Sequence, residues 1–480
     1  MTGSRDLTVA PRPQLITYPG SLGGDLRSLS GLLGGQLAGL FRGVHVLPPF
    51  PSSGDRGFSP LTHTRIAPEF GTWGDIEAIA REHVLMLDVV VNHISRQSQE
   101  FQDFCRRGRD SAFADLFLTL EKVWPDGEPD PADLALLTHR KPGHPFEDVI
   151  VEDTGARERV WTTFGKVGCS EQIDLDVRSS LTRAMIEEWF DVLASHGARI
   201  IRFDAVGYVV KRPGTSCFMV DPDVYEVLDW ARAAAERRGL ILFPEVHDRY
   251  QTHQRLSARG FWTYDFVLPG LVLHAMATGS AQRLAAHLAA SPDRQFTTLD
   301  THDGIPVRPD LEGVLEPDEM LRLTDHIVAN GGNVSRLLSS EPGEADAHQL
   351  NCTYFSALGG DEDRYLAARA IQLFAKGTPQ IYYVGLLAGA NDEEAVERTG
   401  EGRAVNRHDY TVPEIDAALG TSVVTRLLDL IRLRNTHPAF DGELRVETEG
   451  HSGLRLTWSD GATRCSLNVD LATGGIAVDV

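Results

Sequence analysis

The sequence predicts a (β/α)8 barrel, and two observations lead to that prediction. Eight short apolar runs rich in Val, Ile, Leu and Phe recur along the chain, separated by helix-length segments such as SLTRAMIEEWFDVLASHG. Buried parallel strands joined by crossover helices have this pattern. Acidic residues also stand at the downstream ends of several runs, and barrel enzymes form their active sites at that end of the strands.

The expected strands are recognised by their apolar residues and by the helix-length segments between them. They are QLITY (14–18), GVHVLPPF (43–50), LMLDVVVN (85–92), ARIIRFDAV (198–206), LILFPEV (240–246), FWTYDFVLP (261–269), QFTTLDT (295–301) and TPQIYYVG (378–385).

The uneven spacing of these strands predicts two insertions and a C-terminal domain. A long stretch rich in Pro, Gly and charge follows the third strand, and a shorter one follows the seventh. After Pro438 the pattern alternates, as in antiparallel strands with one buried face. We expect barrel segments at 1–93, 179–304 and 359–437, an inserted domain at 94–178, a second insertion at 305–358, and a short antiparallel β domain at 438–480.

Composition excludes several classes of function. The chain has 480 residues, of which 42% are hydrophobic, and its formal charge of −22 argues against binding nucleic acid or an anionic membrane by bulk electrostatics. Five scattered cysteines without a CxxC pair indicate neither a disulfide framework nor a zinc site. With neither a signal-peptide pattern nor an apolar membrane span in the sequence, we expect a cytoplasmic enzyme, monomeric or homodimeric.

Three strand-end acids, Asp204, Glu245 and Asp303, are the candidate catalytic residues. Retaining cleavage of a glycosidic bond needs one carboxylate as nucleophile and a second carboxyl as acid and then base. Arg202 lies two residues before Asp204 on the same strand face, so it would keep Asp204 ionised, whereas the apolar Phe243 and Pro244 would help to raise the pKa of Glu245. Asp303 would stabilise the transition state, with two histidines as hydrogen-bonding neighbours, His93 and His302.

A single acid of this kind is more often a helix cap, a salt-bridge partner or a turn residue than a catalyst. The ordered set DVVVNH, RFDAVGY, FPEVH and TLDTHDG is much more specific, and it resembles the four signature regions of the α-amylase family of glycoside hydrolases. The resemblance implies Asp204 as nucleophile, Glu245 as general acid/base and Asp303 as transition-state stabiliser, and it covers most of the barrel and both insertions.

Longer strings resemble one branch of that family, the sucrose phosphorylase subfamily. They include HVLPPFPSSGDRGFSP, EQIDLDV, NCTYFSAL and GRAVNRHDY. This resemblance implies a closed pocket for one glucosyl unit, in which charged groups grip the hydroxyls and aromatic rings cover the C–H faces. The residues implied are Asp55, Phe58, Phe164, Tyr208, His247, Gln349 and Arg407, although the aromatic ones taken alone are more simply core residues.

Two loops depart from the sucrose enzymes. His348 stands where they resemble one another in having Tyr, and Arg140 replaces a proline beside the basic Lys141. Together with Asp346 in the same loop as His348, these residues are similar to the acceptor loops of sucrose 6F-phosphate phosphorylases, in which such an Arg and His hold a phosphoryl group. The simpler interpretation is that Arg140 and Lys141 are solvated and that His348 caps a turn.

The expected reaction is phosphorolysis of sucrose 6F-phosphate by inorganic phosphate through a covalent glucosyl enzyme. The alternatives are a sucrose phosphorylase, a glucosylglycerate phosphorylase, which also needs cations, a simple α-glucoside hydrolase, and a carbohydrate-binding protein without catalysis. Asn92 occupies a position that helps to bind calcium in many amylases, but the resemblance to this branch implies no metal, and we expect no cofactor.

Overall fold

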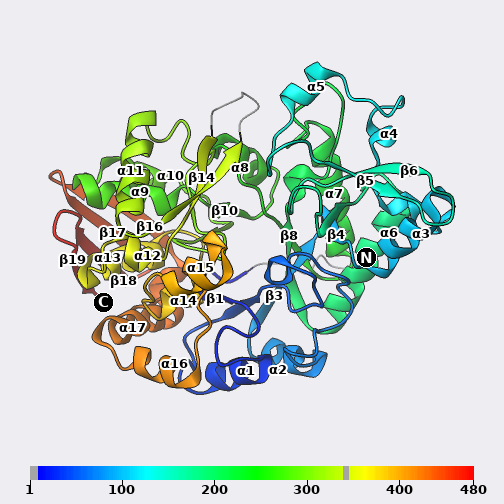
Figure 1. The fold of residues 1–480 in the computed structure, drawn as a ribbon. Helices are drawn as coiled ribbons and strands as arrows, with labels where there is room; N and C mark the ends of the chain where they lie inside the picture. The colour runs from blue at the N-terminus through cyan, green and yellow to red at the C-terminus, as the bar shows by residue number, and fades with distance from the viewer. Residues whose placement is uncertain (1–8, 339–344) are drawn as a thin grey trace. The chain divides into compact units, whose positions relative to one another are not determined.

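The computed structural model describes residues 9–338 and 345–480, and it describes side chains in those ranges except for 335–338 and 345–347. Its main sheet has eight strands in the order β10-β11-β15-β1-β2-β3-β8-β9, of which β1, β3, β8 and β10 are labelled in Figure 1. These strands form a nearly closed parallel barrel, and the expected fold class is confirmed. The strands are β1 (Gln14–Thr17), β2 (Gly43–Val46), β3 (Val84–Val90), β8 (Ala198–Asp204), β9 (Ile241–Pro244), β10 (Thr263–Asp265), β11 (Gln295–Thr297) and β15 (Thr378–Tyr382).

Helices connect the barrel strands, as the amphipathic segments predicted. In α6 (Ser180–Ser195), the Ser179 side chain caps the first turn by accepting from Leu181 N, and apolar residues at helical spacing are buried along one face. The other helices between or after the barrel strands, outside the two insertions, include α1 (Leu26–Gly34), α2 (Trp73–Glu82), α7 (Asp223–Glu236), α8 (Tyr250–Ala258), α9 (Leu268–Thr278), α10 (Gln282–Ala290), α13 (Glu362–Phe374), α16 (Val412–Leu419) and α17 (Ser422–Thr436).

The chain divides into two compact units. The first consists mainly of Val46–Val246, and the second of Thr8–His45, His247–Ser335 and Ala347–Val480. Strands β3, β8 and β9 belong to the first unit, whereas β1, β10, β11 and β15 belong to the second.

In the first unit, the register of the strands sets which side chains meet. Asp88 on β3 pairs with Arg202 on β8, and Arg202 pairs in turn with Phe243 on β9. Side chains at one level of parallel strands point to the same face, so this register brings charged residues of neighbouring strands together.

The segment after the third strand adds a small substructure to the first unit. Strand β4 (His93–Ser95) pairs with β7 (Gln172–Asp174), and β5 (Phe146–Ile150) forms a hairpin with β6 (Arg157–Trp161). Its helices are α3 (Gln99–Arg107), α4 (Leu120–Val123) and α5 (Pro131–Leu136). A buried cluster that includes Trp124, Leu137 and Trp161 forms an apolar core here.

Most of the excursion after the seventh strand belongs to the second unit. Strand β12 (Ile305–Pro306) pairs antiparallel with β14 (Ala345–Asn351), and β13 (Asn333–Leu338) belongs to the same small sheet. The helix expected in this region is α11 (Pro317–Ala329), and the remaining helices of the unit are α12 (Tyr354–Ala357), α14 (Tyr383–Leu386) and α15 (Glu393–Thr399).

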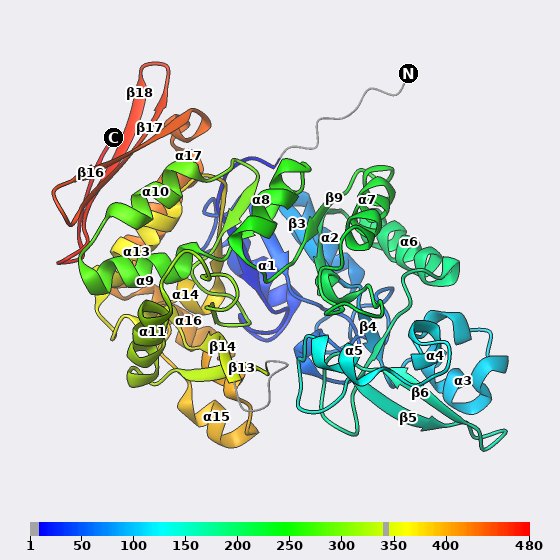
Figure 2. The same ribbon diagram turned by 90° about the horizontal axis from the view of Figure 1, so that it is seen from above.

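The C-terminal residues form the expected antiparallel sheet, with β16 (Glu443–Glu449), β17 (Gly453–Asp460), β18 (Thr463–Asp470) and β19 (Gly475–Asp479) in sequential order. Helix α10 contacts β16, and α13 contacts β18 and β19 (Figure 2). The Trp458 indole donates to Phe374 O at 2.7 Å, which anchors the sheet to the C-terminal end of α13.

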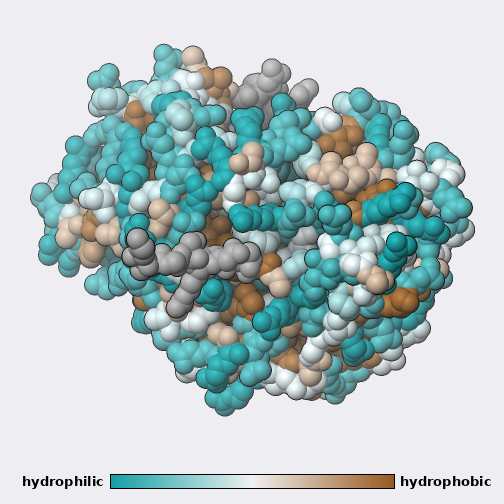
Figure 3. Space-filling model, turned by 180° about the vertical axis from the view of Figure 1, so that it is seen from behind, coloured by the Kyte–Doolittle hydropathy of each residue, from teal (hydrophilic) through white to brown (hydrophobic). Residues whose placement is uncertain are grey.

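Hydrophilic residues predominate on the face shown in Figure 3, and hydrophobic residues form small separate groups there. None of the helices in the described ranges is long and apolar enough to cross a membrane.

Candidate active site

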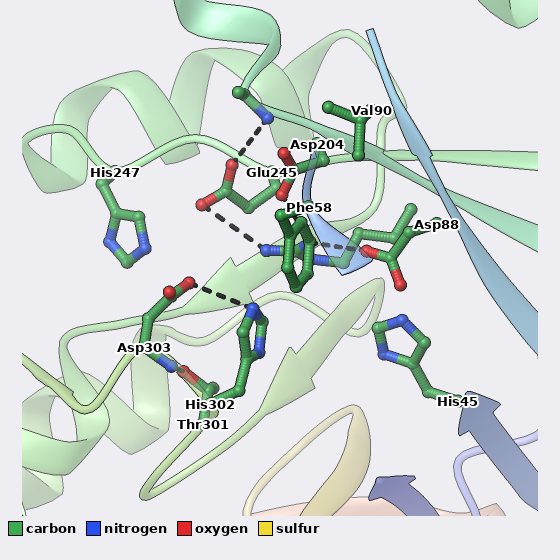
Figure 4. Close-up of polar contacts among 12 residues, drawn as sticks. His45, Phe58, Asp88, Val90, Asp204, Glu245, His247, Thr301, His302 and Asp303 are labelled. Carbon is green, nitrogen blue, oxygen red and sulfur yellow. Dashed lines mark hydrogen bonds and ion pairs between the residues drawn. The ribbon is translucent and has the colours of Figure 1, made fainter. Parts of the chain in front are cut away.

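Arg202 on β8 contacts three carboxylates of the first unit. Its Nη1 lies 2.6 Å from Asp88 Oδ1 and 2.7 Å from Asp204 Oδ1, and its Nη2 lies 3.6 Å from Glu245 Oε1 (Figure 4). The side chains of Arg202 and Asp88 are 2% and 0% exposed, and charges buried to that extent need such partners. The structure therefore brings two of the three expected catalytic acids together on one guanidinium.

The two acids differ in how they are held. Asp204 is in direct hydrogen-bond contact with Arg202, as the sequence predicted, whereas Glu245 is farther from it. Glu245 Oε2 instead accepts from Ala205 N at 3.0 Å, and Ala205 takes a left-handed conformation with φ of 57° directly after β8. A turn in this conformation is strained for alanine and is common at functional sites.

Phe58 is held in the first unit through both its ring and its carbonyl oxygen. The Arg202 guanidinium lies 5.8 Å from the centre of the Phe58 ring. The carbonyl oxygen of Phe58 accepts from His93 Nε2 and Gln172 Nε2, both at 2.9 Å. Burial lowers the pKa of His93, so its imidazole is neutral and its Nδ1 accepts from Asn92. His93 thus positions Phe58.

The expected sugar-binding residue Asp55 lies just before Phe58, in the 3-10 turn Asp55–Gly57. Asp55 and Arg56 have left-handed φ values of 47° and 49°, and a Cβ on Gly57 would lie 2.6 Å from Pro48 O. The backbone of this turn therefore requires glycine at position 57.

Arg140 lies beside two aromatic side chains of the first unit, Phe164 and Tyr208. The rings of Phe164 and Tyr208 meet edge to face at 5.1 Å, and the Arg140 guanidinium carbon lies 5.5 Å and 5.8 Å from their respective centres. Arg140 Nε is buried without a hydrogen-bond partner among the described residues. Arg140 is thus placed on the aromatic residues that the resemblance assigned to the sugar pocket.

Lys141 is placed differently from its neighbour. Its side chain is 4% exposed, and its Nζ contacts Thr162 Oγ1 at 2.8 Å, Phe164 O at 3.3 Å and Glu147 Oε1 at 3.4 Å. Burial lowers the pKa of Lys141, and the nearby Glu147 carboxylate partly offsets this by raising it. These internal contacts support the backbone of Phe164, and they differ from the solvated basic loop that the sequence suggested.

Asp303 in the second unit lies beside one histidine and two arginines. His302 Nε2 is 3.4 Å from its Oδ2 (Figure 4). Arg403 Nη1 and Arg407 Nη2 are 3.3 Å and 3.8 Å from its Oδ1. Arg407 Nε also donates to His302 O at 2.8 Å. The expected residues Asp303, His302 and Arg407 therefore form one group, to which the structure adds Arg403.

His247, Gln349 and His348 form a second group in the same unit. His247 stacks on Phe266 with ring centres 4.0 Å apart, its Nε2 lies 3.3 Å from Gln349 Nε2, and the His348 ring meets it edge to face at 5.5 Å. The expected acceptor residue His348 is buried, and its Nδ1 donates to Arg308 O at 2.5 Å. The side chain of Asp346 lies outside the described part of the structure.

The comparisons with known proteins give the family. Residues 39–260 match the model of the α-amylase catalytic domain. The chain is 50% identical to the sucrose 6(F)-phosphate phosphorylase of Thermoanaerobacterium thermosaccharolyticum, covering 97% of this chain and 96% of that one. The chain belongs to the sucrose phosphorylase subfamily of the α-amylase family.

Two further similarities agree with this. The crystal structure of the sucrose 6F-phosphate phosphorylase from Thermoanaerobacter thermosaccharolyticum matches with a TM-score of 0.96 and 48% identity, over 100% of this chain and 97% of that one. The glucosylglycerol phosphorylase of Marinobacter adhaerens is 43% identical over 95% of this chain and 94% of that one. The chain is thus a disaccharide phosphorylase of the glycosyltransferase type, in a subfamily whose members differ in the acceptor.

Sequence reasoning missed several residues that hold the site of this phosphorylase. Asp88 and Asp310 are fully buried acids, and Lys211 Nζ forms a buried ion pair with Asp174 Oδ2 at 3.0 Å. The sequence does indicate a structural role for Asp88, because a charge inside the apolar run LMLDVVVN needs a partner on a neighbouring strand. Asp310 and Lys211 stand in loop segments whose sequence gives no comparable signal. The expectation that the enzyme uses no metal stays a prediction.

Proposed function

We propose that this phosphorylase cleaves sucrose 6F-phosphate with inorganic phosphate, giving α-D-glucose 1-phosphate and fructose 6-phosphate. The family supports a retaining phosphorylase of this subfamily. The observation that favours a phosphorylated acceptor is the position of Arg140, whose guanidinium lies within cation–π distance of both Phe164 and Tyr208. A forked cation on the sugar-facing aromatic pair suits a phosphoryl dianion.

In the first half-reaction, Asp204 attacks the anomeric carbon while Glu245 gives its proton to the departing fructosyl oxygen. Their different contacts suit these roles. Arg202 lies closer to Asp204 and stabilises it as a carboxylate, whereas Glu245 is held mainly by the neutral amide of Ala205. The products of this step are fructose 6-phosphate and a glucosyl ester on Asp204.

In the second half-reaction, a phosphate oxygen attacks the same anomeric carbon and displaces Asp204, while Glu245 takes the proton from the attacking phosphate. Glucose 1-phosphate leaves with the α configuration because two inversions restore it. Asp303 stabilises the positive charge that develops on the glucosyl ring in both steps, and its ion pairs with Arg403 and Arg407 orient it.

The acceptor is selected by Arg140 and His348. Arg140 supplies a permanent cation with several N–H donors. Since His348 donates its Nδ1 proton to Arg308 O, its Nε2 can donate to a phosphoryl oxygen only when the imidazole is protonated. We therefore assign Lys141 to the support of Phe164 and the phosphoryl contact to Arg140 and His348.

A phosphorolysis panel tests this assignment. The purified enzyme is assayed for glucose 1-phosphate with sucrose 6F-phosphate, sucrose, glucosylglycerate and glucosylglycerol, each with and without inorganic phosphate. The expected result is the highest kcat/KM on sucrose 6F-phosphate and dependence of product formation on inorganic phosphate. A higher kcat/KM on another substrate would refute the acceptor assignment, and phosphate-independent release of glucose would indicate a hydrolase.

A further inference from the structure

Asp310 is a fully buried carboxylate in the loop after β12. Its side chain is 0% exposed, and its ion-pair partners in the described part of the chain are two histidines, His247 and His253. Burial alone would raise the pKa of Asp310, but its contacts with these imidazoles lower it to about 2, so the group is a carboxylate at neutral pH. A buried charge held only by imidazoles fixes where the imidazole protons lie.

The distances show which imidazole Asp310 binds. His247 Nδ1 lies 3.3 Å from Asp310 Oδ2 in hydrogen-bond geometry. His253 Nε2 lies 3.8 Å from Oδ1 and forms its hydrogen bond with Asp248 O, at 3.2 Å. Because a carboxylate can only accept, His247 carries a proton on Nδ1.

The same loop also fixes the second imidazole of this group. Arg308 O accepts from His348 Nδ1, and the backbone N–H groups of Val307 and Arg308 donate to His348 O at 3.0 Å and 3.2 Å. Two residues apart, a carbonyl and a carboxylate thus bind the Nδ1 atoms of His348 and His247. In both rings, Nε2 is therefore the nitrogen that can contact other groups. In His247, this nitrogen contacts Gln349.

We propose that Asp310 is a positioning residue, which acts through His247 by holding the proton on Nδ1 and keeping Nε2 as the acceptor for the amide of Gln349, a residue of the expected sugar pocket. The stack of His247 on Phe266, at an interplanar angle of 12°, fixes the plane of the ring, and Asp310 fixes its rotation and tautomer within that plane. The expected effect on disaccharide binding rests on the proposed function, whereas the position of the proton on His247 does not.

The first experiment is a double-mutant cycle. Asp310→Asn has nearly the same shape but offers an N–H that can donate to Nδ1, so the second tautomer becomes accessible; an Asp→Asn change beside a catalytic histidine has this effect in serine proteases. We expect KM for sucrose 6F-phosphate to rise about fivefold to tenfold, the effect of one disordered hydrogen bond. In a His247→Ala background, Asp310→Asn should change KM by less than about twofold, because the residue through which it acts is gone.

The control is another carboxylate–imidazole contact of equal length. Glu319 Oε1 lies 3.3 Å from His274 Nε2, on α11 and α9. Glu319→Gln should lower Tm and leave KM and kcat unchanged. If Asp310→Asn also lowers only Tm, or if its effect on KM is equally large without His247, then Asp310 is merely structural and the proposal is wrong.

The second experiment is independent of catalysis. In enzyme labelled with [15N]histidine, the nitrogen shifts of His247, assigned by their loss in His247→Gln, should report protonation at Nδ1. Asp310→Asn should produce a population protonated at Nε2. An unchanged nitrogen pattern would overturn the proposal even if the enzyme phosphorolyses sucrose 6F-phosphate, and a changed one would support it even if the substrate proves different.

Discussion

Arg202 and Asp88 form a buried ion pair, with 2.6 Å between Nη1 and Oδ1, and the same Nη1 lies 2.7 Å from Asp204 Oδ1. The strand register sets this arrangement, since Asp88 and Arg202 are direct partners of β3 and β8. Asp88 therefore shares the positive charge of Arg202 with Asp204, the proposed nucleophile. Because Arg202 pairs with both carboxylates, it does not neutralise the charge of Asp204 completely.

We predict that Asp88→Asn lowers kcat by about tenfold to a hundredfold, because Arg202 then pairs more strongly with Asp204 and shifts by a fraction of an ångström. KM should change little. Steady-state kinetics well below the Tm of the variant measure this, with circular dichroism to check folding. If kcat is unchanged while Tm falls, Asp88 is needed for folding alone.

The barrel could be predicted from the sequence because its determinants are local. Each strand is a short apolar run, each helix has its own apolar face, and the acids follow the runs directly. The two-unit division could not be predicted, since it depends on contacts between residues far apart in the chain.

The site could be predicted only in part, for a similar reason. The Arg202–Asp204 contact follows from their spacing of two residues on one strand. Arg140 and Lys141 are adjacent basic residues in one loop. No sequence rule shows that Lys141 turns inward to Glu147 while the Arg140 guanidinium lies over the ring of Phe164. Their difference arises from the tertiary packing of the β5–β6 hairpin.

That difference gives a matched pair of variants. Arg140→Ala should raise KM for sucrose 6F-phosphate by about tenfold to a hundredfold, the effect of losing charged hydrogen bonds, and leave KM for sucrose within about threefold. The ratio of the two KM values measures the effect. Equal changes for both substrates would mean that Arg140 does not bind the phosphoryl group.

Lys141→Met serves as the control for Arg140, because it removes the neighbouring positive charge. Its ammonium supports Phe164 through the carbonyl oxygen, so the variant should lose activity on both substrates to the same degree and should have a lower Tm. A selective loss of affinity for sucrose 6F-phosphate in Lys141→Met would contradict the internal role.

His348→Tyr should shift selectivity towards sucrose. The substitution removes an imidazole that can become cationic and places a neutral phenol there, so KM for sucrose 6F-phosphate should rise about tenfold while KM for sucrose stays the same or falls. Competition between the two substrates in one reaction gives the ratio of kcat/KM directly. An unchanged ratio would exclude His348 from acceptor recognition.

Lys211→Met should destabilise the first unit by about 3–5 kcal/mol, because it leaves the buried Asp174 carboxylate without its ion-pair partner. Calorimetric melting measures this. Lys211→Met combined with Asp174→Asn should recover part of the lost stability, since the uncompensated charge is then gone. If Asp174→Asn lowers the stability of the Lys211→Met variant as much as it lowers that of the wild type, the two residues do not act as a pair.

The stability of the folded enzyme at acid pH depends in part on the Asp310 carboxylate. Its pKa is lowered from 3.8 to about 2 in the folded state, because the contacts with His247 and His253 outweigh burial. A carboxyl with a depressed pKa stabilises the fold fully above its unfolded pKa, and this stabilisation is lost as pH falls through the folded value. The pH-dependent difference in stability between the wild type and Asp310→Asn should therefore be on the order of 2 kcal/mol above pH 4 and should shrink towards pH 2. Thermal melts of both proteins between pH 3 and 7 measure it, and a difference that stays constant over this range would mean that Asp310 is not ionised in the folded enzyme.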